Sequence, residues 1–119
     1  MTKPSVFIVE DDPKLGEIIT ITLQDDFELE LSMDGDDALK RIRETTPDIV
    51  ILDLNLPGTS GADLLTYIRA DGRLNNTRVI LATADERQAE TLTDEADIVL
   101  LKPVSPAQLK DMALRMSPS

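Results

Sequence analysis

Five short runs of mainly apolar residues, each followed by a segment with helical periodicity, restrict this chain to a small group of folds. The runs are SVFIV at 5–9, ELELS at 28–32, DIVILD at 48–53, RVILAT at 78–83 and DIVLL at 97–101. Nearly continuous apolar runs predict strands that are buried on both faces, as in a parallel sheet. The run at 28–32 alternates polar and apolar residues, which is typical of an edge strand.

Helix signals separate these runs. Four residues are predicted to cap helix N-termini, and the first and last of them precede a proline: Asp12, Asp34, Ser60 and Ser105. Apolar residues then recur with helical spacing, which predicts a buried stripe on each helix: Leu15, Ile18, Ile19 and Leu23; Ala38, Leu39 and Ile42; Leu64, Leu65 and Ile68; Leu109, Met112 and Met116. Pro47 is expected to stop the second helix, and a weak, polar helix is expected at about 85–93. The alternation indicates an α/β fold, with a five-stranded parallel sheet covered by helices on both faces.

The composition narrows the functional classes. The 119 residues fit one domain, 1–119, with 117–119 as a tail or the start of a linker. We leave open whether the chain stands alone or is part of a longer protein. Without cysteine there is no disulfide or thiolate metal site, and without histidine the chain lacks the commonest general base. The formal net charge of -11 argues against direct nucleic-acid binding by this domain and suits a cation or a basic partner surface.

Neither a membrane span nor the apolar core of a signal peptide is visible in the sequence, so we predict a cytoplasmic protein.

The residues that end the predicted strands carry complementary chemistry. Ligands of open α/β sheets bind beyond the carboxyl ends of the strands, where the sequence places Glu10, Asp11, Asp53, Thr83 and Lys102. Clustered carboxylates repel one another and favour a cation, and oxygen ligands alone suit Mg²⁺. An ammonium, a hydroxyl, a metal and a carboxylate nucleophile together can hold a phosphoryl group.

Other interpretations of Asp53 have less support. The segment from Asp53 resembles an EF-hand loop, but Leu64 stands where that loop needs a glutamate. Asn55 replaces the second aspartate of a phosphatase DxD motif, and no G-x-G-x-x-G supports a flavodoxin-type cofactor site. An Asx turn at Asp53 and a purely capping role for Asp12 remain open.

Four blocks of the sequence, VFIVEDDPKL, DIVILDLNLPGTSG, VILATA and LLKPVS, resemble the receiver domain of two-component response regulators in order and spacing. The resemblance covers essentially the whole chain. It implies a flavodoxin-like, doubly wound (βα)5 fold with strand order 2-1-3-4-5. It also implies that Asp53 is the phosphoacceptor, that Asp11 binds Mg²⁺ directly and that Glu10 binds it largely through water.

The same resemblance assigns the remaining roles. Asn55 would offer its backbone carbonyl to the metal, Thr83 would hydrogen-bond one phosphoryl oxygen and Lys102 would pair with another. The Lys102–Pro103 peptide is expected to be cis. A histidine kinase or histidine phosphotransfer protein would supply the phosphoryl group. The domain would not be a conventional enzyme, although it would promote its own phosphorylation and dephosphorylation.

Val99 departs from the family pattern, which usually has tyrosine or phenylalanine three residues before the lysine. The usual coupling between Thr83 and an output surface is therefore expected to change. Val99 also favours, mildly, the alternative of a pseudo-receiver that signals by protein interaction without phosphorylation. A metal-dependent phosphatase is a third interpretation, disfavoured because no separate general acid or base is apparent. The kinase, the output partner and the oligomeric state are not specified by the sequence.

Overall fold

The computed structural model describes residues 3–118 and contains a five-stranded parallel sheet in the order β2-β1-β3-β4-β5. The strands are β1 (Ser5–Val9), β2 (Glu28–Ser32), β3 (Ile49–Asp53), β4 (Arg78–Thr83) and β5 (Ile98–Leu101). The helices are α1 (Pro13–Leu23), α2 (Gly35–Glu44), α3 (Gly61–Ala70), the 3-10 turn η1 (Gly72–Leu74), α4 (Glu86–Leu92) and α5 (Pro106–Met116). The predicted fold class and strand order are confirmed. Of the expected tail at 117–119, residue 119 lies outside the described residues.

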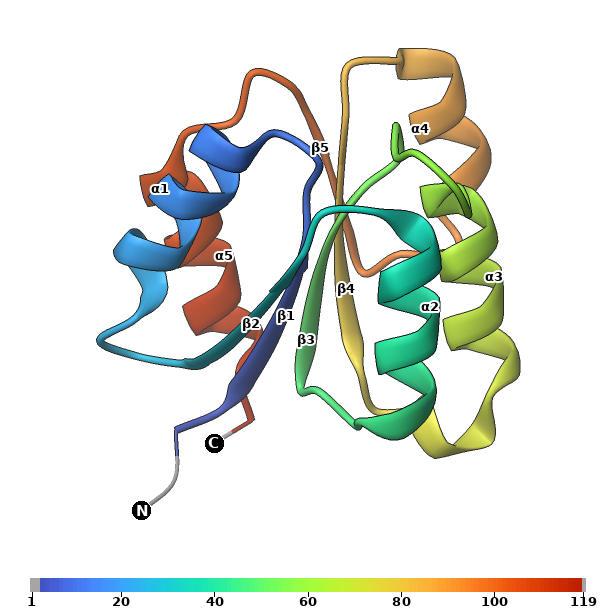
Figure 1. Ribbon diagram of the computed structural model, residues 1–119. Coiled ribbons are helices and arrows are strands. Elements are labelled where there is room, and N and C mark those ends of the chain that lie inside the picture. Colours follow the sequence, from blue (N-terminus) through green and yellow to red (C-terminus); the bar gives the residue numbers. More distant parts are fainter. Residues whose placement is uncertain (1–2, 119) are drawn as a thin grey trace.

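Two apolar cores flank the sheet, because successive side chains of a strand point to opposite faces. Figure 1 shows α1 and α5 covering one face and α2, α3 and α4 covering the other. Alternate residues of the central strands supply the core under α1 and α5: Val6, Ile8, Ile49, Ile51 and Ile80. The residues between them supply the core on the other face: Phe7, Val9, Val50, Leu52, Val79 and Leu81. Burial on both faces explains why these runs are continuously apolar.

The helices begin where the capping residues predict. Each of the four predicted caps accepts a backbone N–H of its helix's first turn at 2.7 to 3.1 Å: Asp12, Asp34, Ser60 and Ser105. Helix α2 ends at Glu44, earlier than the expected stop at Pro47. Arg73 of η1, an element the sequence did not predict, explains the early end. Its guanidinium donates to the Ile42 carbonyl at 2.7 Å and also to the Thr45 carbonyl. These hydrogen bonds replace the intrahelical ones that backbone carbonyls at a helix C-terminus lack.

The prediction that Ile18 belongs to the buried stripe of α1 is wrong. Its side chain is 48% exposed, whereas Ile19 is 3% exposed. The buried residues of α1 are Gly16, Ile19 and Leu23, which are spaced by three and four positions and form one stripe. Ile18 lies about 100° around the helix from Ile19 and therefore faces away from the sheet.

A guanidinium fixes the entry into β5. Arg69, near the end of α3, donates to the Glu95 carbonyl at 2.6 Å, to the Thr77 carbonyl at 3.0 Å and to the Asp97 carboxylate at 2.8 Å. Asp97 also accepts the N–H of Val79 at 2.7 Å. The carboxylate of Asp97 thus serves as an anchor, and the strand begins one residue later than predicted, at Ile98. Among residues 3–118, no helix has the length and apolar character needed to cross a bilayer.

Two neighbouring isoleucines provide a test of this packing. We expect Ile19→Ala to lower the free energy of unfolding by about 2–5 kcal/mol, because it removes a buried side chain between α1 and the sheet. The matched change Ile18→Ala should alter it by less than about 0.5 kcal/mol. Urea denaturation followed by circular dichroism measures both. Comparable losses from the two variants would contradict the observed orientation of α1.

Candidate functional site

Three carboxylates meet at the carboxyl ends of β1 and β3, which are neighbours in the sheet. Glu10 follows β1 and Asp53 ends β3, and the two residues are only 4% and 5% exposed. Asp11 is exposed beside them. One carboxylate oxygen from each of the three residues lies within 4.8 Å of the others. Sequence positions far apart therefore supply one acidic cluster, as the strand ends indicated.

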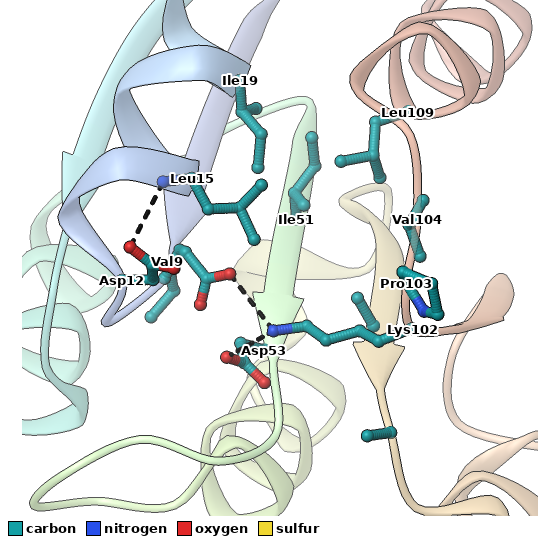
Figure 2. Close-up of a pocket in the computed structure, with 13 residues that line it drawn as sticks. Val9, Asp12, Leu15, Ile19, Ile51, Asp53, Lys102, Pro103, Val104 and Leu109 are labelled. Atoms are coloured by element: carbon teal, nitrogen blue, oxygen red, sulfur yellow. Dashed lines mark hydrogen bonds and ion pairs between the residues drawn. The ribbon is translucent and has the colours of Figure 1, made fainter.

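Lys102 enters this cluster from the end of β5. Its Nζ lies 3.2 Å from Glu10 Oε1 and 3.0 Å from Asp53 Oδ2 (Figure 2). The peptide bond to Pro103 is cis, as predicted. The backbone N–H of Lys102 donates to the Thr83 carbonyl at 2.8 Å, which continues the β4–β5 pairing by one residue. One ammonium group thus bridges two buried carboxylates.

Thr83 and Asn55 bond within their own loops. The buried Thr83 hydroxyl accepts the N–H of Asp85 at 3.1 Å. The N–H of Asn55 donates to Asp53 Oδ1 at 3.1 Å. This contact is the Asx-type bond that the sequence left open, and it coexists with the ion pair on the other oxygen, Oδ2. Asp53 is therefore held through both of its oxygens.

The acidic pair shares one proton in the absence of a metal. Burial, together with the hydrogen bond and charge of Asp53, raises the pKa of Glu10 to about 8, and the opposing effect of Lys102 is smaller. Burial also tends to raise the pKa of Asp53, but hydrogen bonds from Glu10, the Asn55 amide and Lys102 outweigh it and hold that pKa below its usual value. The pKa of Lys102 is raised, because both acids outweigh the effect of its burial. These shifts favour a protonated Glu10 beside an ionised Asp53 and a charged Lys102.

The donor set fits a hard divalent cation. All three side chains offer carboxylate oxygens, and this is the one such cluster of acidic side chains among residues 3–118. Oxygen ligands are those that Mg²⁺ prefers, and a cation at this position would replace the proton that Glu10 holds. The chemistry of the residues present therefore suits Mg²⁺.

An apolar cavity of about 480 Å³ adjoins the charged groups. Its walls come from α1, the sheet and the segment after β5, and they include Leu15, Ile19, Val104 and Leu109 (Figure 2). The sequence analysis did not predict this cavity, because apolar residues at helical spacing indicate core packing and carry no signal for a hollow.

The family of this chain is shown by comparison with known proteins. The family described as the response regulator receiver domain matches residues 6–114. The chain is a receiver domain of the two-component response regulators. The predicted family and general function are thus confirmed, and the comparisons give no support to the pseudo-receiver alternative.

Individual relatives agree with this assignment. The DNA-binding response regulator MtrA of Mycolicibacterium smegmatis is 36% identical over 108 residues, which are 87% of this chain and 46% of that protein. The receiver domain of a putative LuxO repressor protein from Vibrio parahaemolyticus is 31% identical, with a TM-score of 0.86 over 96% of this chain and 89% of the other. The response regulator TrrA of Thermotoga maritima, in complex with Mg²⁺ and BeF, is 28% identical, with a TM-score of 0.83 over 95% and 98%. The chain spans about half the length of the curated relatives.

The proton on Glu10 predicts an unusual pH dependence. The folded protein holds this proton up to about pH 8, whereas an ordinary glutamate, with a pKa of 4.5, has lost it. Between these values the folded state binds more protons than the unfolded state, so the stability of the metal-free protein should fall as pH rises.

Glu10→Gln removes the titrating group and should remove this contribution. The unfolding free energy of the original protein, relative to that of the variant, should fall steadily from pH 5 to pH 8. Urea denaturation in a chelator, repeated at several pH values, measures it. A difference that does not depend on pH would contradict the shared proton.

Proposed function

We propose that Asp53 accepts a phosphoryl group in a reaction that depends on Mg²⁺. The observation that carries this proposal is the buried Asp53 carboxylate, ionised and 3.0 Å from the Lys102 ammonium within the acidic cluster. Receiver domains of response regulators receive the phosphoryl group from histidine kinases, and we propose a histidine kinase or a histidine phosphotransfer protein as the donor. We place the reaction in the cytoplasm, where response regulators typically act.

The proposed transfer uses groups already in place. An Asp53 oxygen attacks phosphorus, the phosphorus–nitrogen bond to the donor imidazole breaks, and the electron pair leaves with the imidazole nitrogen. Lys102 balances the charge on a phosphoryl oxygen, and the Thr83 hydroxyl donates to another. Glu10, Asp11, Asp53 and the Asn55 carbonyl would hold Mg²⁺, which supplies further charge neutralisation when bound. Attack of water on the acyl phosphate would return the domain to its resting state.

We propose that a partner reads the phosphorylated state through a protein surface. The net charge of -11 suits a basic protein partner better than the phosphate backbone of a nucleic acid. MtrA is named as a DNA-binding response regulator, but this chain covers less than half of MtrA. We therefore propose no DNA binding for this domain.

The start of α4 is the first element that the new phosphoryl group would disturb. Asp85 caps α4 by accepting the N–H of Arg87 at 2.9 Å, and its own N–H donates to the Thr83 hydroxyl at 3.1 Å. If this hydroxyl turns toward a phosphoryl oxygen, the contact with Asp85 breaks. Val99 lines a hollow of about 320 Å³ between α4 and β5, together with Ala89 and Leu101. With no aromatic side chain there to turn inward, we propose that the response is concentrated in the Thr83 loop and α4.

The phosphoacceptor can be tested by mass. With Mg²⁺ and a small acyl phosphate, the protein should gain one phosphoryl group, because Asp53 is the ionised and buried carboxylate beside Lys102. Asp53→Asn should abolish the gain, whereas Asp63→Asn, a change at an exposed acid, should preserve it. Intact-mass spectrometry measures the labelled fraction. Equal labelling of the original protein and Asp53→Asn would rule out the assignment.

Hydrogen exchange tests the path of the response. A beryllofluoride adduct at Asp53 should change exchange most in residues 83–94, because the Asp85 cap is tied to Thr83 and α4 is short. Val99→Tyr should extend the change toward residues 99–109 by placing a ring next to the space that Thr83 vacates. If the original protein already responds equally in both regions, Val99 does not limit the response.

A further inference from the structure

The loop between β3 and α3, residues 54–60, is tied to the first turn of α2. The N–H of Gly35 donates to the Pro57 carbonyl at 2.9 Å. Asp36 Oδ1 accepts two hydrogen bonds from Thr59, one from its backbone N–H at 3.0 Å and one from its hydroxyl at 2.7 Å. These contacts join segments of the chain that are separated by 23 residues.

The backbones of α2 and of the 54–60 loop lie so close together that two positions of this contact require glycine. A Cβ atom at Gly35 would lie 1.6 Å from the Thr59 carbonyl oxygen, so any side chain there would push the loop away from α2. Gly58 has a φ of +77°, and a Cβ atom there would lie 2.7 Å from Asp36 Oδ2. Glycine is the residue that tolerates this conformation, and its small size admits the Asp36 carboxylate. The far end of the loop is therefore held in one position.

The near end of the same loop belongs to the proposed metal site. Asn55 follows Asp53 by two residues, donates its N–H to Asp53 Oδ1, and is the residue whose carbonyl would face the metal. A backbone carbonyl has no side-chain torsions of its own, so the fold of the loop sets its direction. A loop that must become ordered when the cation binds would lower the affinity of the site.

We propose that Asp36 is a positioning residue for the divalent cation. Through Thr59, its carboxylate holds residues 54–60 in the conformation that presents the Asn55 carbonyl to Mg²⁺. This inference rests on the proposed function, in which the acidic cluster takes Mg²⁺. Asp36 itself does not belong to that cluster, and its contacts lie at the other end of the loop.

Two simpler roles for Asp36 make different predictions. An acid in the first turn of α2 interacts favourably with the helix dipole, and that role would affect stability but not the affinity for a cation. A negative charge near the site would also attract a cation through space, and any exposed acid at a similar position would then serve. Only positioning requires an oxygen acceptor at this residue.

Three variants separate these roles. Asp36→Ala removes both the charge and the acceptor, Asp36→Asn removes the charge but keeps an acceptor oxygen, and Asp63→Ala removes an exposed charge from the first turn of α3. Isothermal titration calorimetry with Mg²⁺ gives the affinity of each. Hydrogen exchange in a chelator reports the order of residues 54–60 without metal, and thermal unfolding reports stability.

We expect Asp36→Ala to weaken Mg²⁺ binding by about threefold to tenfold, as the loss of one or two exposed hydrogen bonds would. Exchange at residues 54–60 should be faster in the metal-free variant. The labelling rate with an acyl phosphate at saturating Mg²⁺ should match that of the original protein. Asp36→Asn and Asp63→Ala should bind Mg²⁺ within about twofold of the original protein.

Several results would overturn the positioning role. They are unchanged Mg²⁺ affinity in Asp36→Ala, an equal loss in Asp36→Asn or Asp63→Ala, and unchanged exchange in residues 54–60. Each of these leaves the proposed function intact if the original protein still binds Mg²⁺ and is labelled at Asp53. Failure of the original protein to bind Mg²⁺ would instead overturn both proposals.

Discussion

The ion pairs of Lys102 with Glu10 and Asp53 hold together the edge of the sheet at the carboxyl ends of the strands. Two buried carboxylates at neighbouring strand ends would repel each other and lose their hydration, and an unpaired charge in such a place is strongly destabilising. Lys102 reaches them from β5, on the other side of β4. Ala82, which pairs with Asp53 in the β3–β4 register, lines the same cavity as Lys102, and its small side chain leaves room for the lysine stem. The position of the Lys102 ammonium thus depends on the small size of Ala82, which carries no functional group of its own.

The metal-free site is organised around a proton and an ammonium where the active site would hold a divalent cation. This arrangement holds Asp53 through both of its carboxylate oxygens. The strands need not move to create the site, because adjacent parallel strands bring their carboxyl ends together. The loops carry what can change: Thr83 bonds Asp85, and Asn55 belongs to a loop whose other end rests on α2. The sheet therefore carries Asp53, and the hydrogen-bonded loops around it carry Thr83 and Asn55 contacts that the proposed phosphorylation would change.

Much of this fold follows from the sequence, and the exceptions have physical causes. The strands were predictable because burial on both faces makes their sequences continuously apolar. The helix caps were predictable because the unpaired N–H groups at a helix start need a polar side chain, as Asp12 and Ser105 illustrate. Ile18 was assigned to the core because spacing alone does not fix which side of a broad apolar stripe faces the sheet.

The acidic cluster was predictable from the strand ends, and the roles of its members came from family resemblance. The contacts of Asp36 with Thr59, and of Arg69 and Arg73 with distant carbonyls, were not predictable. Each of these contacts joins a side chain to the backbone of a residue that is distant in the sequence. No periodic pattern in the sequence indicates such a pair. The apolar cavity beside Lys102 likewise depends on how α1 and α5 are placed over the sheet, which is a tertiary property.

The anchoring of β5 by Arg69 has a mechanical consequence. The guanidinium holds the Glu95 carbonyl and Asp97, so the connection that leaves α4 is fixed to α3 and β4. At the opposite end of α4, the N–H of its capping residue Asp85 donates to the Thr83 hydroxyl, beside the acidic cluster. A helix that is fixed at one end and released at the other rotates about its fixed end. If Asp53 is phosphorylated as proposed, we therefore expect the largest displacement of α4 at its end beside Asp53 and the smallest at the end held by Arg69.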